Sequence, residues 1–335
     1  MALDRRLLNK TLADNKAAGV TWWAGETSML HLTADERKLR LGYVPGPGEL
    51  SLEKREQLAA DIISPHPIPY PYGLPQVWTW TFVNGGRNFL PDIKDQGNCG
   101  SCVAFGTAAA IDGMMRVAMG IAANDPNAGD LQDVSEAQMF YCGAEQQGRT
   151  CAGPNAGWWV GAALQYAMDP GVAPESCFPY TAGDQGCGVC AGWQSQVTQI
   201  APWEEPASPA AMKAALASIG PLITVFRVYE DFYSYKGGVY AYNGSAPFVG
   251  GHCVCVVGYD EPKQAWICRN SWGPGWGEGG YFYIGYGQCG IDALMWSITS
   301  FKTIYHLPQD SVGRTRGPKR ARLPQAKPLT RKKGK

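Results

Sequence analysis

The pattern of apolar residues changes about two thirds of the way along this 335-residue chain. In the earlier part, apolar residues recur at helical spacing, which predicts helices over residues 3–17, 50–63, 102–118 and 156–167 and another beginning near Ser135. From residue 222 onward, short runs of β-branched and aromatic residues predict strands at 222–226, 253–257, 265–268 and 280–284. Helices followed by strands indicate an α+β protein whose two halves pack together.

Breaks in this pattern divide the chain into three parts. Residues 21–27 are aromatic and predict an extended segment. Residues 65–71 alternate with proline, which excludes a helix or a central strand and predicts an extended linker. Beyond residue 307, Gly, Pro, Lys and Arg predominate, and we expect disorder there.

Charge is distributed unevenly along the chain. The formal net charge is zero, but residues 314–335 carry ten Lys and Arg and no acid. The remaining residues hold 19 basic and 29 acidic side chains, a net charge of −10. An acidic body with a basic tail suggests contact between residues 314–335 and polyanions, while a merely solvated tail is the alternative.

Eleven cysteines in a chain of this size suggest disulfides and an oxidising compartment. Two Cys-x-x-Cys pairs, which end at Cys102 and Cys190, have zinc-like spacing and keep a structural metal as an alternative. Only four histidines are present, however, and none is near either pair in sequence, so no metal and no cofactor are expected.

Two features of the sequence bear on where the protein is found. No stretch approaches the ~20 continuous apolar residues of a membrane helix. Residues 1–10 are too charged for a secretory signal, which conflicts with the cysteine count. We expect an extracellular or lysosome- or vacuole-like compartment, reached by a route that the sequence does not specify.

The segment from Lys94 to Val103 contains the most informative chemistry. It places the thiol of Cys102 at the start of an alanine-rich helix, where the free N–H groups and partial positive charge of a helix N-terminus stabilise a thiolate. Gln96, six residues upstream, can direct an amide N–H at an oxyanion. These are two of the groups that thiol-dependent peptide hydrolysis requires.

The other two groups follow much later in the sequence. His252 is the only histidine of the predicted main body, so it must carry protons if the chain is a peptidase. Asn270 can accept the second ring N–H of this histidine and orient it, and Trp272 can shield that hydrogen bond from water. The alternatives are a disulfide-bonded or core cysteine at position 102, a helix-capping glutamine at position 96 and an ordinary core aromatic residue at position 272.

The run Cys99-Gly100-Ser101-Cys102 with a distant His and Asn resembles the papain and cathepsin family of cysteine peptidases, and its cathepsin B-like branch in particular. The resemblance implies a helical lobe, a β-barrel-like lobe and an active-site cleft between them. It also implies an inhibitory prosegment over residues 1–73, with Thr21-Trp22 and Ala24-Gly25 as the matching motif, a peptidase domain over 74–306 and a tail over 307–335. A small accessory domain is the alternative for residues 1–73. Position 103 departs from the family, because it holds Val where an aromatic residue is usual.

The same resemblance assigns roles to further residues. It implies the disulfides Cys99–Cys151, Cys142–Cys187 and Cys177–Cys190, and leaves Cys253, Cys255, Cys268 and Cys289 as buried free thiols. It gives Gly157, in an altered glycine segment, a role in binding the substrate backbone. The pocket for the second residue before the cut (P2) would be lined by Val225, Gly251, Cys253 and Leu294, and the leucine predicts hydrophobic P2 residues rather than arginine.

The resemblance also bears on where a substrate is cut. Cathepsin B carries a histidine-bearing loop that occludes the cleft and binds the terminal carboxylate of a substrate. Here only residues 178–189 separate the corresponding cysteines, and none of them is His, Lys or Arg. We therefore expect a monomeric endopeptidase, made as a zymogen, that cuts protein and peptide substrates. Two other function classes stay open. One is a non-catalytic binding relative with the same fold, and the other is a binder of nucleic acid or anionic surfaces that uses the tail.

Overall fold

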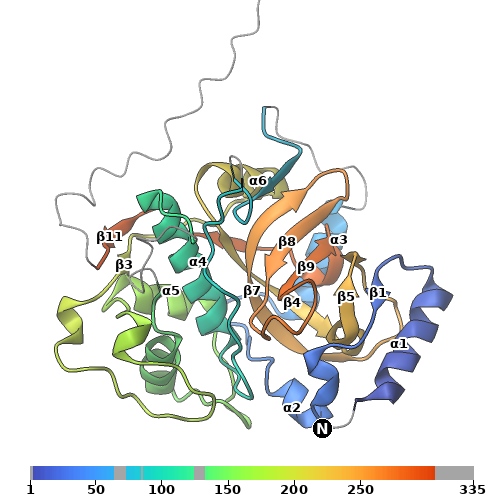
Figure 1. The fold of residues 1–335 in the computed structure, drawn as a ribbon, viewed down its shortest axis with the longest axis horizontal. Helices are drawn as coiled ribbons and strands as arrows, with labels where there is room; N and C mark the ends of the chain where they lie inside the picture. The colour runs from blue at the N-terminus through green and yellow to red at the C-terminus, as the bar shows by residue number, and fades with distance from the viewer. Residues whose placement is uncertain (1–2, 64–72, 84–85, 124–132, 306–335) are drawn as a thin grey trace, which may run out of the picture.

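A helical half and a half built on a β-sheet pack side by side in the computed structural model (Figure 1). The structure describes residues 3–63, 73–83, 86–123 and 133–305. The predicted linker at 65–71 and the basic tail lie outside the described residues, as does the first part of the stretch from Tyr70 to Gln76 in which we expect activation cleavage. The α+β arrangement predicted from the sequence is confirmed.

Helix α4 (Cys102–Met119) forms the centre of the molecule, between the two halves. Every residue from Cys102 to Arg116 is buried, because small side chains on all sides of the helix allow both halves to approach it. By length and composition this helix could cross a membrane, but 83% of its apolar window is buried inside the protein, as expected for a core helix. It ends at Gly120, which adopts φ 68° as the C-cap.

The main sheet has seven strands and carries the second half of the fold. Its strand order is β10-β4-β7-β8-β9-β6, with β2 paired to β7, and within the described residues the ladder does not close into a ring. Its strands are β2 (Val77–Thr79), β4 (Leu222–Tyr229), β6 (Val239–Tyr240), β7 (Phe248–Asp260), β8 (Ala265–Arg269), β9 (Tyr281–Gly285) and β10 (Met295–Ser297). All four predicted strands are present, and β4 and β7 extend beyond their predicted ends because they pair with each other along most of their length.

The remaining elements are short. The helices are α1 (Arg5–Ala18), α2 (Ala34–Lys38), α3 (Leu52–Ile63), α5 (Val160–Met168) and α6 (Pro209–Ser218). The small strands are β1 (Trp23–Ala24), β3 (Gln199–Ile200), β5 (Tyr235–Gly237) and β11 (Phe301–Thr303). Short 3₁₀ turns are η1 (Ser28–His31), η4 (Glu145–Gln147), η5 (Glu175–Cys177), η6 (Trp193–Ser195), η7 (Glu230–Ser234) and η8 (Gln288–Gly290), and η3 (Gln138–Ala144) is a π-helix.

Two helices differ from the sequence-based expectation. Helix α5 was expected from residue 156 but begins at Val160, because Gly157 has φ 85° and Trp158 pairs with Tyr43 instead of joining the helix. The helix expected at Ser135 is largely a π-helix, although the Ser135 hydroxyl does accept the Gln138 N–H as a cap.

Three disulfides crosslink the helical half. They join Cys99 to Cys151, Cys142 to Cys187 and Cys177 to Cys190, the same three pairs that the family resemblance implies. The five other cysteines of the chain are free and buried. Closing loops of these lengths contributes roughly 2–4 kcal/mol per bridge.

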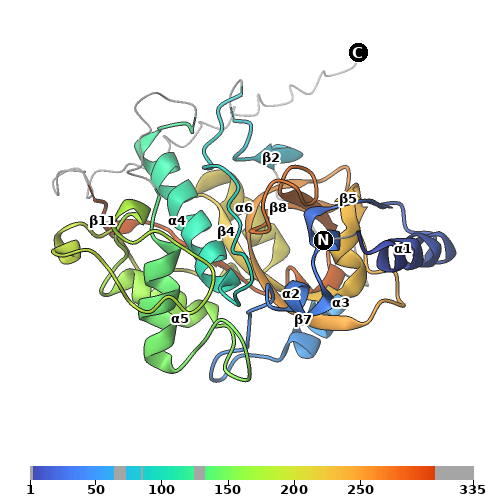
Figure 2. The same cartoon turned by 60° about the horizontal axis from the view of Figure 1, so that its bottom comes forward.

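Residues 3–63, called the N-terminal segment below, pack mainly against the sheet half (Figure 1). Strand β1 pairs with β5, and Trp22 is buried against the rings of Tyr235 and Tyr240 while its indole N–H donates to the Ala241 carbonyl at 2.8 Å. Helix α3 contacts η8 and β4, and its first residue, Leu52, faces Gly251 of β7 (Figure 2). The chain between α2 and α3 runs across the junction of the two halves.

Candidate active site

Cys102 is the first residue of α4 and is completely buried. Burial raises the pKa of its thiol to about 11, although the backbone N–H groups of Cys253, Gly42 and Val103 and its own N–H oppose that shift. The N–H of Gly42 lies 3.3 Å from the sulfur. The thiol therefore has the donors of a helix N-terminus around it but is protonated in this state.

His252 and Asn270 form the second part of the site. Antiparallel pairing of β7 and β8 brings them together: the imidazole Nε2 lies 2.7 Å from the Asn270 Oδ1. The Trp272 ring packs over the imidazole with a centroid distance of 4.7 Å, where it excludes water from that hydrogen bond. The imidazole Nδ1 is buried and forms no hydrogen bond with the described residues, so it is the ring atom free for a further partner. Burial lowers the pKa of His252 to about 4.

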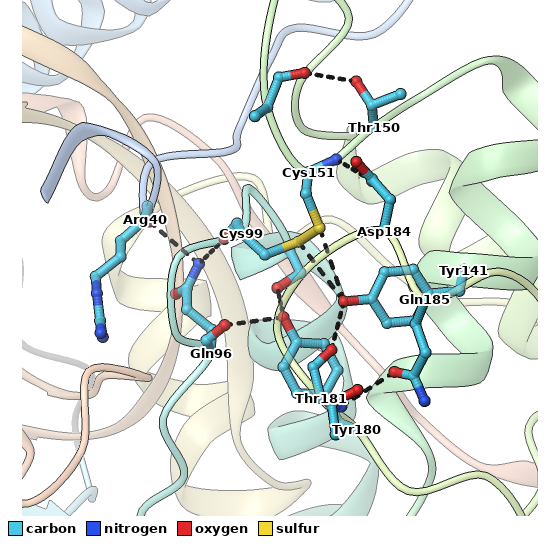
Figure 3. Close-up of a disulfide and its surroundings, with 12 residues drawn as sticks. Arg40, Gln96, Cys99, Tyr141, Thr150, Cys151, Tyr180, Thr181, Asp184 and Gln185 are labelled. Carbon is cyan, nitrogen blue, oxygen red and sulfur yellow. Dashed lines mark hydrogen bonds between the residues drawn. A yellow bond between two sulfur atoms is a disulfide. The ribbon is translucent and has the colours of Figure 1, made fainter. Parts of the chain in front are cut away.

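Gln96 is held from both sides (Figure 3). Its Oε1 accepts the Ser271 hydroxyl at 2.6 Å, and its Nε2 donates to the carbonyl of Cys99 at 2.9 Å and to that of Arg40 at 3.2 Å. The Tyr180 hydroxyl donates to the Gln96 backbone carbonyl at 2.8 Å. This network fixes an amide N–H donor beside the start of α4, as an oxyanion site requires.

The N-terminal segment passes directly over these groups. The carbonyl of Arg40 occupies the Gln96 amide, and the guanidinium of Arg40 forms an ion pair with Asp95. Gly42 donates its N–H to the Cys102 sulfur and accepts the Trp158 N–H at 2.8 Å. The Cys102 thiol and the Gln96 amide are therefore both covered by one stretch of three residues.

Backbone pairing continues beyond Gly42. Tyr43 donates its N–H to the Gly251 carbonyl at 3.1 Å, and Val44 donates to the Trp158 carbonyl at 3.0 Å. Gly157 allows this close approach, since a Cβ there would lie 2.1 Å from the Gly42 carbonyl oxygen. An extended chain is thus held between Trp158 on the helical half and Gly251 on the sheet half.

The side chain of Tyr43 lies in an apolar region next to this backbone pairing. Its ring packs at Gly251, and the Tyr43 hydroxyl donates to Glu49 at 2.7 Å. Arg55 binds the same Glu49 carboxylate at 3.0 Å and lies between the rings of Tyr43 and Trp296. The other residues of the predicted P2 pocket, Val225, Cys253 and the partly buried Leu294, belong to the same apolar cluster as Tyr43.

The geometry can be compared with known proteins. Residues 74–299, about two thirds of the chain, match the family described as papain family cysteine protease. The chain belongs to the papain family. The site above therefore lies in a papain-family cysteine protease, and peptide hydrolysis through a thiol is the activity that membership implies.

Relatives of this papain-family protease include several cathepsins. It is 33% identical over 217 residues to "Cathepsin B-like CP3" of Giardia intestinalis, which covers 61% of this chain and 68% of the relative. It is 32% identical over 219 residues to "Pro-cathepsin H" of Mus musculus, covering 62% and 60%. The chain therefore spans about two thirds of the length of the first relative and less than two thirds of the length of the second.

Solved structures of proenzymes share the fold of this papain-family protease. "Structure of digestive procathepsin L2 proteinase from Tenebrio molitor larval midgut" matches with a TM-score of 0.64 and 26% identity over 88% of this chain and 92% of that one. "proCathepsin B S9 from Trypanosoma congolense" matches with a TM-score of 0.66 at 24% identity, which covers 88% and 98% and shows the fold alone.

Sequence reasoning did not identify two contributors to this site. Trp158, rather than Gly157 alone, provides the backbone N–H and C=O that pair with an extended chain. Gly42 lies so close to the helical half that a Cβ would be 1.9 Å from the Gly100 carbonyl oxygen. Neither position carries a local signal, because each depends on segments that are far apart in sequence.

Proposed function

We propose that this protein is a cysteine endopeptidase, made as a zymogen, in which Cys102 and His252 carry the chemistry. The observation that supports it most strongly is a set of three groups. They are the thiol at the start of α4, an imidazole that is oriented by Asn270 and precedes the Cys253 N–H at that thiol, and a fixed Gln96 amide. Each group meets one requirement of peptide hydrolysis through a thiol.

These positions support the following reaction. His252 takes the Cys102 proton through Nδ1, and the thiolate attacks the carbonyl carbon of the substrate. The resulting oxyanion accepts hydrogen bonds from the Gln96 amide and the Cys102 backbone N–H. The imidazolium then protonates the leaving amine, and water, deprotonated by the neutral imidazole, hydrolyses the thioester and restores the thiol. Asn270 keeps the ring oriented throughout.

The N-terminal segment is proposed to inhibit the enzyme as its prosegment. It covers the same hydrogen-bond donors that a substrate needs. The Arg40 carbonyl lies at the Gln96 amide, but the group against the Cys102 sulfur is the N–H of Gly42. The segment therefore offers the thiol no carbonyl carbon to attack. Relatives solved as proenzymes support this role. Cleavage between Tyr70 and Gln76 would release the cleft.

The inhibited state predicts a low reactivity of the thiol. Burial raises the pKa of Cys102 to about 11 and lowers that of His252 to about 4, so both are neutral between these values. We expect alkylation of Cys102 by iodoacetamide at pH 6 to be at least about 100-fold slower in the full chain than after removal of the N-terminal segment. In the full chain the rate should rise with pH toward 11, since only the thiolate reacts.

Peptide mass mapping measures this rate at each cysteine separately. The buried thiols Cys255 and Cys268 serve as internal controls, which should stay unlabelled in both forms. Equal labelling of Cys102 in the two forms at pH 6 would contradict the proposed inhibition.

The apolar region around Tyr43 supports a hydrophobic P2 preference. A bulky ring already lies against Gly251 there, and Leu294 supplies no carboxylate for an arginine. A carboxylate does lie beside this region, that of Glu49, which pairs with Arg55. Both residues belong to the N-terminal segment and would leave with it.

We expect endopeptidase action rather than removal of C-terminal dipeptides. Residues 178–189 lie between Cys177 and Cys190, contain no cation, and are further restrained by the Cys142–Cys187 bridge. A long peptide amidated at its C-terminus and its free-acid form should therefore be cut internally at similar rates, as followed by mass spectrometry. Stepwise dipeptide loss from the free acid alone would refute this expectation.

A further inference from the structure

A carboxylate of the N-terminal segment is bound by the sheet half next to the Tyr43 region. The Tyr229 hydroxyl lies 2.9 Å from both carboxylate oxygens of Glu56, and the Arg227 Nε lies 3.3 Å from one of them. Glu53 adds a weaker contact, 3.9 Å from the Arg227 Nη1. Arg227 and Tyr229 thus form a receptor for a carboxylate, called the Arg227–Tyr229 pair below.

The guanidinium is held in place by groups of the sheet half itself. It packs 4.3 Å from the ring centroid of Phe248 and 5.6 Å from that of Tyr229. The side chain of Arg227 is only 12% exposed while the N-terminal segment is in place. Two aromatic faces of the sheet half therefore orient the planar group in addition to Glu56.

Strand register places Arg227 on the face of the sheet that the N-terminal segment covers. Arg227 is directly opposite Gly251 in the β4–β7 ladder, and residues opposite each other share a face. A Cβ on Gly251 would meet Tyr43 and the Leu52 side chain of α3, so that face points at the segment. Val225, two residues before Arg227, is on the same face and is part of the predicted P2 pocket.

The path of the N-terminal segment gives the order of positions along the cleft. Arg40 lies at Gln96, Gly42 at Cys102, Tyr43 at Gly251, and α3 then reaches Arg227. The Arg227–Tyr229 pair is therefore on the Tyr43 side of the nucleophile, beyond the apolar region. Both carboxylates within 4 Å of Arg227 among the described residues belong to the N-terminal segment.

We propose that, once the N-terminal segment has been removed, the Arg227–Tyr229 pair is a substrate subsite that binds an acidic side chain in the P2–P4 stretch. The proposal rests on the proposed endopeptidase function and specifies its substrates as peptides with an apolar residue and a carboxylate before the cut. Glu56 occupies the subsite in the zymogen as a substrate carboxylate would in the active enzyme. A charge-assisted hydrogen bond from Tyr229 and an ion pair with Arg227 favour glutamate over the isosteric glutamine.

The test uses enzyme processed to remove the N-terminal segment and peptide pairs that differ only by Glu or Gln at P2, P3 or P4. We expect kcat/KM for the Glu peptide to exceed that for the Gln peptide by about tenfold at one of these positions, less at high salt. Arg227→Met keeps an apolar stem against Phe248 and should bring the Glu/Gln ratio of kcat/KM to about one. Tyr229→Phe should reduce it in part. Lys263→Met removes a cation at the β7–β8 turn, away from Arg227 in the ladder, and should leave it unchanged.

Each outcome has a defined meaning. If wild-type enzyme cuts Glu and Gln peptides equally at all three positions, the subsite is refuted while the proposed endopeptidase function stands. The subsite is also refuted if Arg227→Met raises the activity of the full chain but leaves the Glu/Gln ratio of the processed enzyme unchanged. The Arg227–Tyr229 pair would then only anchor the N-terminal segment. If no peptide of either series is cut, the endopeptidase function itself is wrong.

Discussion

Replacing Cys102 by alanine is expected to lower kcat/KM of the processed enzyme at least about 10⁴-fold, and His252→Ala should do the same. The first change removes the only atom that can form the thioester. The second removes the group that takes the thiol proton and later returns one to the leaving amine. The two losses should not add in the double variant, because nucleophile and base act as a unit.

Asn270→Ala should be less damaging than either change, since the nucleophile and the base both remain and only the ring orientation is lost. Cys255→Ala provides a control for the loss of a buried β7 thiol and should retain activity. The measurement is hydrolysis of a fluorogenic peptide by variants processed with an added protease, with thermal unfolding to verify the fold. Wild-type rates for Cys102→Ala would show that the active site has been assigned to the wrong residues.

Adding one methyl group at Gly42 is expected to produce a full-length protein that is active without processing. A Cβ at this position would lie 1.9 Å from the Gly100 carbonyl oxygen and 2.6 Å from the Gly100 Cα, and neither is a flexible side chain that can move aside. The N-terminal segment of Gly42→Ala must therefore move away from the sulfur. We expect the activity of uncleaved full chain to rise at least about 100-fold, which corresponds to a loss of about 2.7 kcal/mol in docking.

The matched control is Gly48→Ala in the same segment. Gly48 has φ 79°, so alanine is strained there, but nothing lies within 4 Å of the added Cβ. This variant should remain inhibited. Activity is measured on a short peptide while gel analysis verifies that the chain is intact. If Gly42→Ala stays as inactive as the wild type, the N-terminal segment does not inhibit through its contact with the start of α4.

Sequence patterns predicted the parts of this fold that depend on local chemistry. The alanine-rich run after Cys102 predicted α4 within one residue, and β-branched runs located β4, β7, β8 and β9. Helix α6 was not predicted, although Ser208 caps it and Pro209 occupies its first turn, because its mixture of alanine and few bulky residues carries little periodicity.

The candidate site was predictable only as far as its residues carry distinctive chemistry. Cys102, Gln96, His252 and Asn270 could be named because few side chains can fill such roles. The other contributors to the site could not be predicted from local sequence patterns. They act through backbone groups or through partners more than 100 residues away, and they are Trp158, Gly42 and the Arg227–Tyr229 pair. The face that Arg227 occupies becomes visible only from the β4–β7 register.

The three disulfides restrain only one of the two halves that border the cleft. All of them are in the helical half, where Cys151 lies in the loop that leads to Trp158 and Cys99 lies next to the start of α4. The half that contributes Trp158 is therefore covalently crosslinked, whereas the half that contributes Gly251 and the predicted P2 residues is held by non-covalent contacts alone among the described residues. In reducing surroundings we therefore expect the Trp158 side of the cleft to loosen before the side that carries the predicted P2 pocket.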